Sequence, residues 1–247
     1  MNRSPEWSSE PADAVTGDAT LQSQVLEDLT EAVNYRRWQA ELARPYLGAD
    51  PLEIGSGNGD FAATIADQGG QITASEAEAS RLAALRARFA TDDRVAVREI
   101  AVPITETADH TSVVAFNVLE HIPDHVGALR AFAGLVREGG AVVVFVPAFA
   151  FAMSRFDRAI GHQRRYTAAS LSAAMKEADL RVRTVHYVNA IGLPTWVLGM
   201  RVLRMTPKSG PVLRVWDSHV MPRMQRWESR RPPPFGQSVF CVAEKVH

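Results

Sequence analysis

The chain has 247 residues, with 27 Lys and Arg against 28 Asp and Glu, and its formal net charge is −1. This length fits one α/β domain with additions, and an apolar content of 46% suits a sizeable buried core. The single cysteine, Cys241, excludes an internal disulfide framework and a multi-cysteine metal site. Residues 1–20 lack the basic and apolar regions of a secretory signal, so we expect a cytoplasmic protein.

The charges are distributed unevenly along the chain. Residues 1–150 carry 11 basic and 22 acidic side chains, a net charge of −11, whereas residues 151–247 carry 16 and 6, a net charge of +10. This asymmetry indicates either an anionic partner for the second part or a set of solvated helix faces. No run of Lys and Arg is interleaved with stacking aromatic residues, so nucleic acid is not an expected partner.

The N-terminal region precedes the first predicted strand. Residues 1–20 are rich in Ser, Pro, Asp and Glu with little to bury, which predicts a disordered tail. Apolar residues at helical spacing over 21–43 predict a helix that stops at Pro45. Tyr35 and Trp38 are three positions apart and therefore share one face of this helix.

The rest of the chain is organised around residues 52–61, which read LEIGSGNGDF. A short apolar run leads into three glycines at alternate positions, and helical spacing follows, which predicts a strand, a turn and a helix. Glycine lets the backbone turn sharply and lets a ligand approach it closely, and the first N–H groups of the helix point into the turn. The sequence therefore predicts a nucleotide-type pocket at the carboxyl end of a parallel sheet.

The spacing of these glycines narrows the choice of ligand. A dinucleotide fingerprint places its third glycine at position 60, where this chain has Asp60, and the third glycine comes one residue early at Gly59. Glu53 before the turn also suits a positively charged ligand better than a phosphate. The pattern Glu53-x-Gly55-x-Gly57-x-Gly59 resembles the first motif of class I S-adenosylmethionine-dependent methyltransferases. The resemblance implies that the turn holds the methionine part of the cofactor and that Glu53 helps to hold its ammonium group.

Two further acidic residues follow predicted strands at the same edge of the sheet. Glu76 follows the strand 71–75, about twenty residues beyond the first glycine, where an acid accepts hydrogen bonds from a ribose diol. The resemblance makes it the family's second motif. At the end of the third strand, 94–100, the family's usual contact for the adenine amino group is less clear, and Glu99 or backbone groups are the candidates.

A second distinctive motif follows the predicted fourth strand, 111–116, and reads NVLEHI. It resembles the segment after strand four in the methyltransferase type 11 and 12 subfamilies. The resemblance implies that Asn117 and Val118 border the sulfonium of the cofactor. His121 is a candidate for catalysis, and the alternative is that Glu120 and His121 orient the loop by hydrogen bonds.

A helix is predicted at 128–137, and the Gly-Gly pair at 139–140 ends it. The fifth strand is expected at 141–147, and an insertion at 148–167 follows it. From Asp157 the insertion reads DRAIGHQRRYT, and this pattern is similar to one in a bacterial subset of these methyltransferases. Connections after strands four and five face the acceptor side of the cofactor in this fold. The resemblance therefore implies that the insertion contacts the methyl acceptor.

The insertion carries the residues that we expect to act on the acceptor. An imidazole can remove the proton of an acceptor hydroxyl, which makes His162 the predicted base. Arginines suit an anionic group through forked hydrogen bonds. The alternative is a loop pinned by its own Arg–Asp pairs. The residues predicted to bind the acceptor are Tyr35, Asp157, Arg164, Arg165 and Tyr166.

The last predicted elements are a helix at 170–178, a strand at 180–188 and a final strand at 237–244. A second insertion at about 189–235 separates the two strands and contains apolar stretches with arginines. These stretches either cap the acceptor pocket, contact a lipid-like acceptor or a membrane surface, or form ordinary core packing or a dimer face. Peripheral membrane contact is thus an alternative location.

The resemblance covers residues 34–245 and implies an α/β, Rossmann-like fold with a seven-stranded, mostly parallel sheet and helices on both faces. We expect a single domain over 21–247 after the tail. We expect S-adenosylmethionine-dependent O-methylation of a small-molecule, sugar or lipid-linked hydroxyl with an anionic portion, by a monomer or homodimer. The alternatives are N- or C-methylation and a cofactor-binding protein without catalysis. The implied cofactor residues are Glu53, Gly55, Ser56, Gly57, Gly59, Glu76, Glu99, Asn117 and Val118.

The sequence requires no metal. There is no clear cluster of His and Asp ligands, although His162 with Asp157 leaves room for one.

Overall fold

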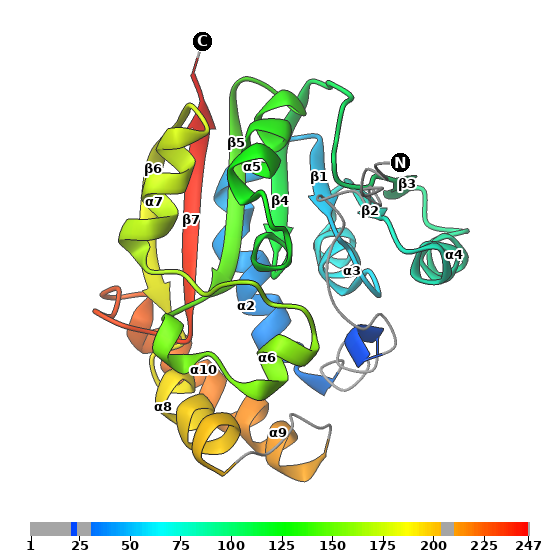
Figure 1. Cartoon of the computed structure of the whole chain (residues 1–247). Coiled ribbons are helices and arrows are strands. Elements are labelled where there is room, and N and C mark those ends of the chain that lie inside the picture. Colours follow the sequence, from blue (N-terminus) through cyan, green and yellow to red (C-terminus); the bar gives the residue numbers. More distant parts are fainter. Residues whose placement is uncertain (1–20, 24–30, 204–209, 247) are drawn as a thin grey trace, which may run out of the picture.

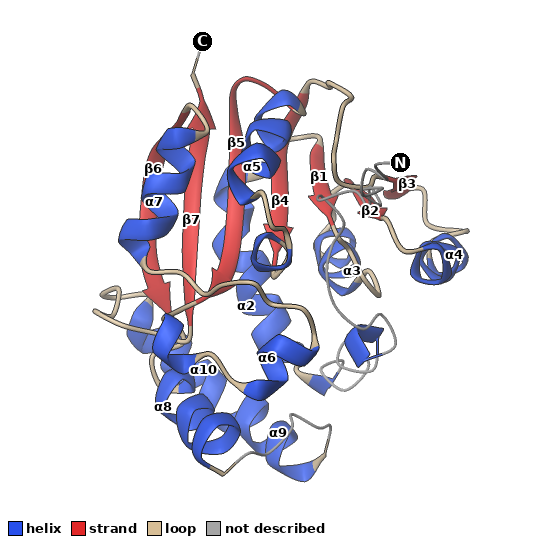
Figure 2. Cartoon of the chain, in the orientation of Figure 1, coloured by secondary structure: helices blue, strands red, loops and turns tan. Residues whose placement is uncertain are grey.

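The seven strands of the computed structural model, which describes residues 21–23, 31–203 and 210–246, form one sheet in the order β3-β2-β1-β4-β5-β7-β6. All neighbouring strands are parallel except those that pair with β7, and helices cover both faces of the sheet (Figure 2). The predicted fold class is confirmed. The tail predicted at residues 1–20 lies outside the described residues. The strands are β1 (Pro51–Ile54), β2 (Ile72–Glu76), β3 (Val95–Glu99), β4 (His110–Phe116), β5 (Val136–Pro147), β6 (Leu180–Val188) and β7 (Ser238–Lys245).

The helices occur where the sequence has helical spacing or local capping. Asp124 caps the helix after β4 by accepting the N–H of Gly127 at 2.8 Å. Ser154 and Thr167 each begin a helix with a reciprocal capping box. The helices are α2 (Val33–Ala43), η2 (Arg44–Tyr46), α3 (Asp60–Asp67), α4 (Ala79–Arg88), η3 (Leu119–His121), α5 (His125–Gly134), η4 (Ala150–Ala152), α6 (Arg155–Ala159), α7 (Ala168–Glu177), α8 (Gly192–Trp196), η5 (Val197–Val202), α9 (Pro211–Val215), η6 (Trp216–Val220) and α10 (Met221–Glu228).

The sheet separates two buried clusters because successive side chains of a strand point to opposite faces. In β5, Val142, Val144 and Val146 join the cluster under α5 and α7, whereas Val143 and Phe145 join the one under α2, α3 and α10. A strand buried on both faces needs nearly continuous apolar residues, which explains the valine run of β5.

Two predicted boundaries are wrong. The Gly-Gly pair at 139–140 does not end a helix but lies inside β5, which begins at Val136, and α5 ends earlier, at Gly134. The pairing of β4 with β5 jumps from His110↔Val136 to Ser112↔Ala141. The extra residues of β5 form a bulge, and Gly139 allows it because its φ of 69° suits glycine.

The helix predicted over 21–43 is described only in part. Residues 21–23 are helical, residues 24–30 lie outside the described residues, and α2 begins at Val33. Its first turn is held by a distant side chain: the carboxylate of Asp217 in η6 accepts the N–H groups of Asn34 and Tyr35 at 2.8 and 2.9 Å. The second insertion thus fixes the start of α2.

The two insertions lie together at the carboxyl ends of the parallel strands. Figure 1 shows α6, from the first insertion, beside α8, α9 and α10, from the second, below the strand ends. The indole N–H of Trp196 donates to the carbonyl of Ala152 at 3.2 Å and joins the two segments. Within the described ranges, no helix is long and apolar enough to span a bilayer.

Candidate functional site

The Gly-rich turn between β1 and α3 has the backbone that the sequence predicts. Gly55, Gly57 and Gly59 have φ values of 69°, 54° and 78°, in the left-handed region that side chains other than glycine rarely adopt. A Cβ at Gly59 would lie 2.6 Å from side-chain atoms of Leu85 and Phe89, so close helix packing also requires glycine there. The turn therefore exposes its backbone and lets α4 pack against it.

Glu53 lies in β1 with its side chain directed into the interior. It is 5% exposed, and its Oε2 has no hydrogen-bond partner among the residues that the structure describes. Burial raises the pKa of this carboxyl to about 7. A buried acid with a free oxygen beside the turn suits a cationic ligand, since an ammonium would supply both the charge and the hydrogen bond.

Glu76 joins the end of β2 to the Gly-rich turn. Its Oε2 accepts the N–H of Gly57 at 3.0 Å, and its Oε1 accepts the N–H groups of Ala77 and Glu78, each at 3.0 Å. The next strand places Glu99 directly beside Glu76 in the sheet register, with an exposed side chain. Both acids therefore lie at the same edge as the glycines, as the sequence predicts.

Ser56 ties the same turn to β2. Its N–H donates to the carbonyl of Ser75 at 2.7 Å, and its hydroxyl accepts the N–H of Ser75 at 3.0 Å. Ser56 is therefore held in the wall of the turn by backbone contacts.

The loop after β4 lies against the turn. A Cβ on Gly55 would lie 2.7 Å from a methyl carbon of Val118, so these two residues are in contact. Asn117 has a φ of 54°, and its N–H donates to the carbonyl of Phe145 at 2.8 Å. The structure thus brings the two strongest sequence motifs together at one edge.

Three side chains form a compact cluster at the end of this loop. Glu120, His121 and His162 each offer a ligand atom, and these atoms all lie within 4.8 Å of one another. The rings of His121 and His162 meet edge to face with 4.6 Å between their centroids. Glu120 is fully buried, and burial raises the pKa of its carboxyl to about 7. The Glu120–His121–His162 cluster combines two imidazoles with a buried carboxylate.

Asp157 lies on the Nδ1 side of His162 and pairs with Arg165. Asp157 Oδ1 lies 3.0 Å from His162 Nδ1 and accepts an N–H of Arg165 at 2.7 Å. Burial raises the pKa of Asp157, but the nearby His162, the positive charge of Arg165 and the hydrogen bonds from Ser154 and Arg165 outweigh it and hold that pKa below its usual range. Arg165 also donates to the carbonyl of Ala148 at 3.1 Å. Its side chain is 2% exposed. These contacts favour the alternative in which Arg–Asp pairs pin the loop.

The first insertion is bound directly to the loop after β4. Arg164 donates to the backbone carbonyls of Ile122 and, at 2.8 Å, Pro123. The hydroxyl of Tyr166 lies 3.1 Å from Nδ1 of His125, and the N–H of residue 163 donates to the carbonyl of residue 120 at 2.8 Å. Arg164 and Tyr166, predicted to bind the acceptor, therefore also hold the two loops together.

Tyr35 packs on the sheet. Its ring is 6.1 Å from Trp38 and meets Phe145 edge-on at 6.3 Å. Burial raises the pKa of its hydroxyl, which hydrogen-bonds to Ser238. This placement favours packing over contact with a ligand.

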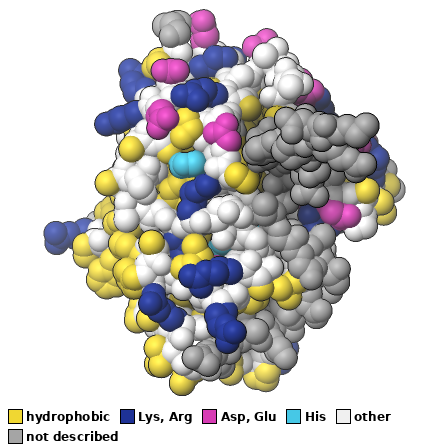
Figure 3. Space-filling model, in the orientation of Figure 1, with side chains coloured by type: hydrophobic (Ala, Val, Ile, Leu, Met, Phe, Trp, Pro, Cys, Tyr) yellow, Lys and Arg dark blue, Asp and Glu magenta, His cyan; other side chains and the backbone are white. Residues whose placement is uncertain are grey.

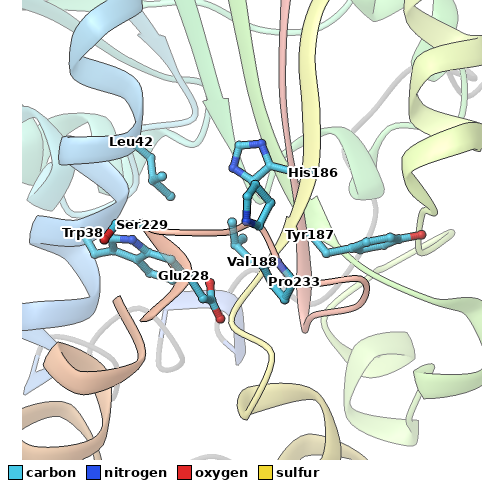
Figure 4. Close-up of a pocket in the computed structure, with 9 residues that line it drawn as sticks. Trp38, Leu42, His186, Tyr187, Val188, Glu228, Ser229 and Pro233 are labelled. Carbon is cyan, nitrogen blue, oxygen red and sulfur yellow. The ribbon is translucent and has the colours of Figure 1, made fainter. Parts of the chain in front are cut away.

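A cavity of about 70 Å³ lies between α2, the end of β6 and α10 (Figure 4). It is much smaller than the ~300–1,000 Å³ of typical ligand sites. None of the predicted cofactor or acceptor residues lines it. Its lining residues are Trp38, Leu42, His186, Tyr187, Val188, Glu228, Ser229, Pro232 and Pro233.

Glu120 is a candidate site residue that the sequence pattern does not indicate. The only signal was its position next to His121 in the motif after β4, and a Glu-His pair serves equally well to orient a loop. Its importance becomes visible when the fold brings His162 to within 3.8 Å of its Oε1.

Known proteins share this sequence pattern. A family model described as a methyltransferase domain matches residues 26–185. A ubiquinone biosynthesis O-methyltransferase of Xanthomonas oryzae is 29% identical over 157 residues, which are 56% of this chain and 65% of that protein. One of Albidiferax ferrireducens is 34% identical over 103 residues, or 40% of this chain and 41% of that protein. The match thus spans less than two thirds of the length of these curated relatives.

Solved structures share the fold. Geranyl diphosphate C-methyltransferase of Streptomyces coelicolor, in complex with Mg²⁺, geranyl diphosphate and S-adenosyl-L-homocysteine, has a TM-score of 0.57 at 16% identity, covering 84% of this chain and 77% of that one. The [4+2]-cyclase SpnF has a TM-score of 0.56 at 16% identity, covering 94% and 99%. At these identities the similarity establishes the fold alone.

Proposed function

The chain belongs to the methyltransferase domain family and uses S-adenosylmethionine as its methyl donor, and we propose that it O-methylates a hydroxyl of a small-molecule, sugar or lipid-linked acceptor. The Glu120–His121–His162 cluster beside the cofactor loop carries this proposal. An oxygen nucleophile benefits from a group that accepts the proton of its hydroxyl or weakens the O–H bond, and the cluster offers such groups. The names of the relatives, O-methyltransferases of ubiquinone biosynthesis, also support oxygen as the acceptor atom.

The cofactor is proposed to bind across the Gly-rich turn. When bound, it supplies an electrophilic methyl group on a sulfonium. The buried, unpartnered Oε2 of Glu53 fits the ammonium of its methionine part, and the edge position of Glu76 fits the ribose diol. Val118, in contact with Gly55, would border the sulfonium. Glu99, beside Glu76, remains the side-chain candidate for the adenine.

His162 is the proposed base. The carboxylate of Asp157, 3.0 Å from Nδ1, favours the tautomer with its proton on Nδ1, which leaves Nε2 to accept a proton from the acceptor hydroxyl. His162 is only partly buried, so a ligand at the edge can reach it. Asp157 and Arg165 are proposed to position this ring, since neither is exposed to an acceptor.

The surface around the insertions supports an acceptor with an anionic and an apolar portion. In the lower part of Figure 3, where the insertions lie, Lys and Arg side chains are seen beside hydrophobic ones without Asp or Glu among the described side chains, whereas in the upper part they are mixed with acidic side chains. Arg155 and Arg158 are exposed on α6, and Phe151 and Leu198 are 55% and 56% exposed. Forked hydrogen bonds from arginine suit a phosphate or carboxylate, and the apolar side chains suit a ring or chain.

An extract of the producing cell is used to determine which atom of the acceptor receives the methyl group. The protein is incubated with S-adenosylmethionine that carries a trideuteromethyl group, and mass spectrometry identifies metabolites that gain it. The NMR shift of the transferred methyl group in the purified product then distinguishes O-, N- and C-methylation. An O-methyl product is expected, and an N- or C-methyl product would overturn the proposal.

The same product gives an assay for His162. His162→Ala is expected to lower turnover by about a hundredfold or more, the range for loss of a general base. Affinity for the cofactor is expected to be unchanged, because His162 lies outside the Gly-rich turn. His219→Ala, at an exposed histidine of η6, is the matched control. Near-normal turnover of His162→Ala across pH would transfer the role to His121.

A further inference from the structure

We propose that Glu120, His121 and His162 bind a divalent transition-metal cation, with Zn²⁺ as its most suitable member. The three ligand atoms lie within 4.8 Å of one another, and they come from η3 and from the first insertion. The sequence shows no need for a metal, because the third ligand is about forty residues away from the other two. Only the fold brings the three side chains to one point.

The carboxylate of Glu120 is the first argument. Both of its oxygens are buried, and neither has a hydrogen-bond partner among the described residues. Nε2 of His162 lies 3.8 Å from Oε1, which is too far for a hydrogen bond. A buried carboxylate is costly unless a positive charge or a donor satisfies it. A cation between Oε1 of Glu120 and Nε2 of His162 would bind both atoms and would neutralise the buried carboxylate.

The contacts behind His162 are the second argument. Histidines that bind a metal through one ring nitrogen almost always pair the other with a carboxylate or carbonyl, which fixes the ring and its tautomer. His162 is placed for this arrangement, with Nδ1 3.0 Å from the carboxylate of Asp157 and Nε2 3.8 Å from that of Glu120. Asp157 is itself fixed by Arg165 at 2.7 Å and by the N–H and hydroxyl of Ser154 at 2.6 and 2.7 Å.

The donor set selects the kind of cation. Two imidazole nitrogens and one carboxylate oxygen suit Zn²⁺ and similar ions, whereas Mg²⁺ and Ca²⁺ prefer oxygen ligands. Ligand distances of about 2.1 Å place two ligands of a tetrahedral Zn²⁺ about 3.4 Å apart. The 3.8 Å between Glu120 and His162 therefore needs to shrink by only a few tenths of an ångström. Three protein ligands leave a fourth position open, as in catalytic zinc sites.

This inference rests on the proposed function and changes one role in it. The acceptor hydroxyl would take the fourth position, and the cation would lower the pKa of that hydroxyl, so that His162 acts as a ligand and not as the base. The hydroxyl proton would leave to solvent. The oxygen would form the new O–CH₃ bond as the S–CH₃ bond of the cofactor breaks, leaving neutral S-adenosylhomocysteine.

The site is tested by binding, without an assay of turnover. The full chain, prepared without a histidine tag, is stripped with a chelator and titrated with Co²⁺, whose visible absorption reports bound nitrogen and oxygen ligands. Calorimetry with Zn²⁺ gives the stoichiometry and the affinity. One site per chain is expected, with a dissociation constant in the micromolar range or tighter, and no comparable binding of Mg²⁺.

Variants locate the cation. Glu120→Gln and His162→Ala are each expected to weaken Zn²⁺ binding by about a hundredfold or more, and Asp157→Asn by about 10–100-fold through the orientation of His162. His219→Ala is the matched control and should bind as the wild type does. Thermal unfolding of the metal-free proteins checks that each variant is folded.

Two results would overturn the metal site. One is a wild-type protein that binds neither Co²⁺ nor Zn²⁺ in the micromolar range. The other is unchanged affinity in folded Glu120→Gln and His162→Ala. In either case the O-methyl product would still stand, with His162 as its base. Conversely, an N- or C-methyl product would refute the proposed function while the Co²⁺ spectrum still reported the site.

Discussion

The cofactor edge and the acceptor edge of the sheet lie side by side but are built in different ways. The cofactor edge, residues 53–59 with Glu76, is held by backbone groups and by partners 19 to 22 positions apart in the chain. The acceptor edge, residues 117–125 with 155–167, is held by side chains whose partners lie 41 or 42 positions away. The geometry of the cofactor edge therefore depends on the backbone conformation of the Gly-rich turn. The geometry of the acceptor edge depends on which side chains come into contact with the neighbouring loop.

This difference also appears in the charges of the two edges. At the cofactor edge one oxygen of the Glu53 carboxylate has no hydrogen-bond partner within the described part of the chain, which suits a cationic ligand. At the acceptor edge Asp157 and Arg165 pair with each other away from solvent, while both oxygens of Glu120 lack a hydrogen-bond partner among the described residues. The cofactor edge is therefore expected to respond to its cationic ligand and to pH, and the chain to lose stability when one partner of the Asp157–Arg165 pair is removed.

The largest effect is expected from a side chain in the Gly-rich turn. Gly57→Arg should abolish S-adenosylmethionine binding, because φ is 54° there and the new side chain would occupy the space of the cofactor. Calorimetric titration measures it. Gly199→Arg is the matched control, because a Cβ at Gly199 would meet nothing within 4 Å, and it should bind normally. Normal binding by Gly57→Arg would remove the cofactor from this turn.

A smaller effect, on stability, is expected at the acceptor edge. Arg165→Ala leaves the carboxylate of Asp157 buried without its charged partner and should lower the free energy of unfolding by about 3–5 kcal/mol. Urea unfolding measures it. Arg155→Ala, an exposed arginine of α6, should change that free energy by no more than about 0.5 kcal/mol. Equal effects in the two variants would contradict a buried network.

The smallest effect concerns pH at the cofactor edge. Because burial raises the pKa of Glu53 to about 7, its carboxyl is mostly protonated at pH 6 and mostly charged at pH 8. The cofactor ammonium favours the charged form, so binding releases a proton and the dissociation constant should be about tenfold higher at pH 6 than at pH 8. Glu53→Gln should bind weakly with little dependence on pH. A wild-type slope that persists in Glu53→Gln would exclude Glu53 as its source.

The elements predicted most closely are those with a local cause. The strand predicted at 180–188 is observed with those bounds, and Asp124 caps α5 through an N–H only three positions away. The boundaries near Gly139 and Gly140 were wrong because a bulge depends on pairing with β4, which no window of the sequence contains. Glycine ends helices more often than it sits within strands, so the local rule favoured the wrong alternative.

The sequence by itself determined the fold class and the Gly-rich turn at which the cofactor is proposed to bind. Glycines at alternate positions after a buried strand form a turn with little help from distant residues. The position of Glu76 follows from the length of one β-α-β unit. The tertiary structure alone decided how the acceptor edge is assembled. His162 meets Glu120, and Arg164 meets the carbonyls of Ile122 and Pro123, because the first insertion folds back onto the loop after β4. Contacts between residues about forty positions apart require the ends of a long loop to come together, and the local spacing of residues does not predict which ends meet.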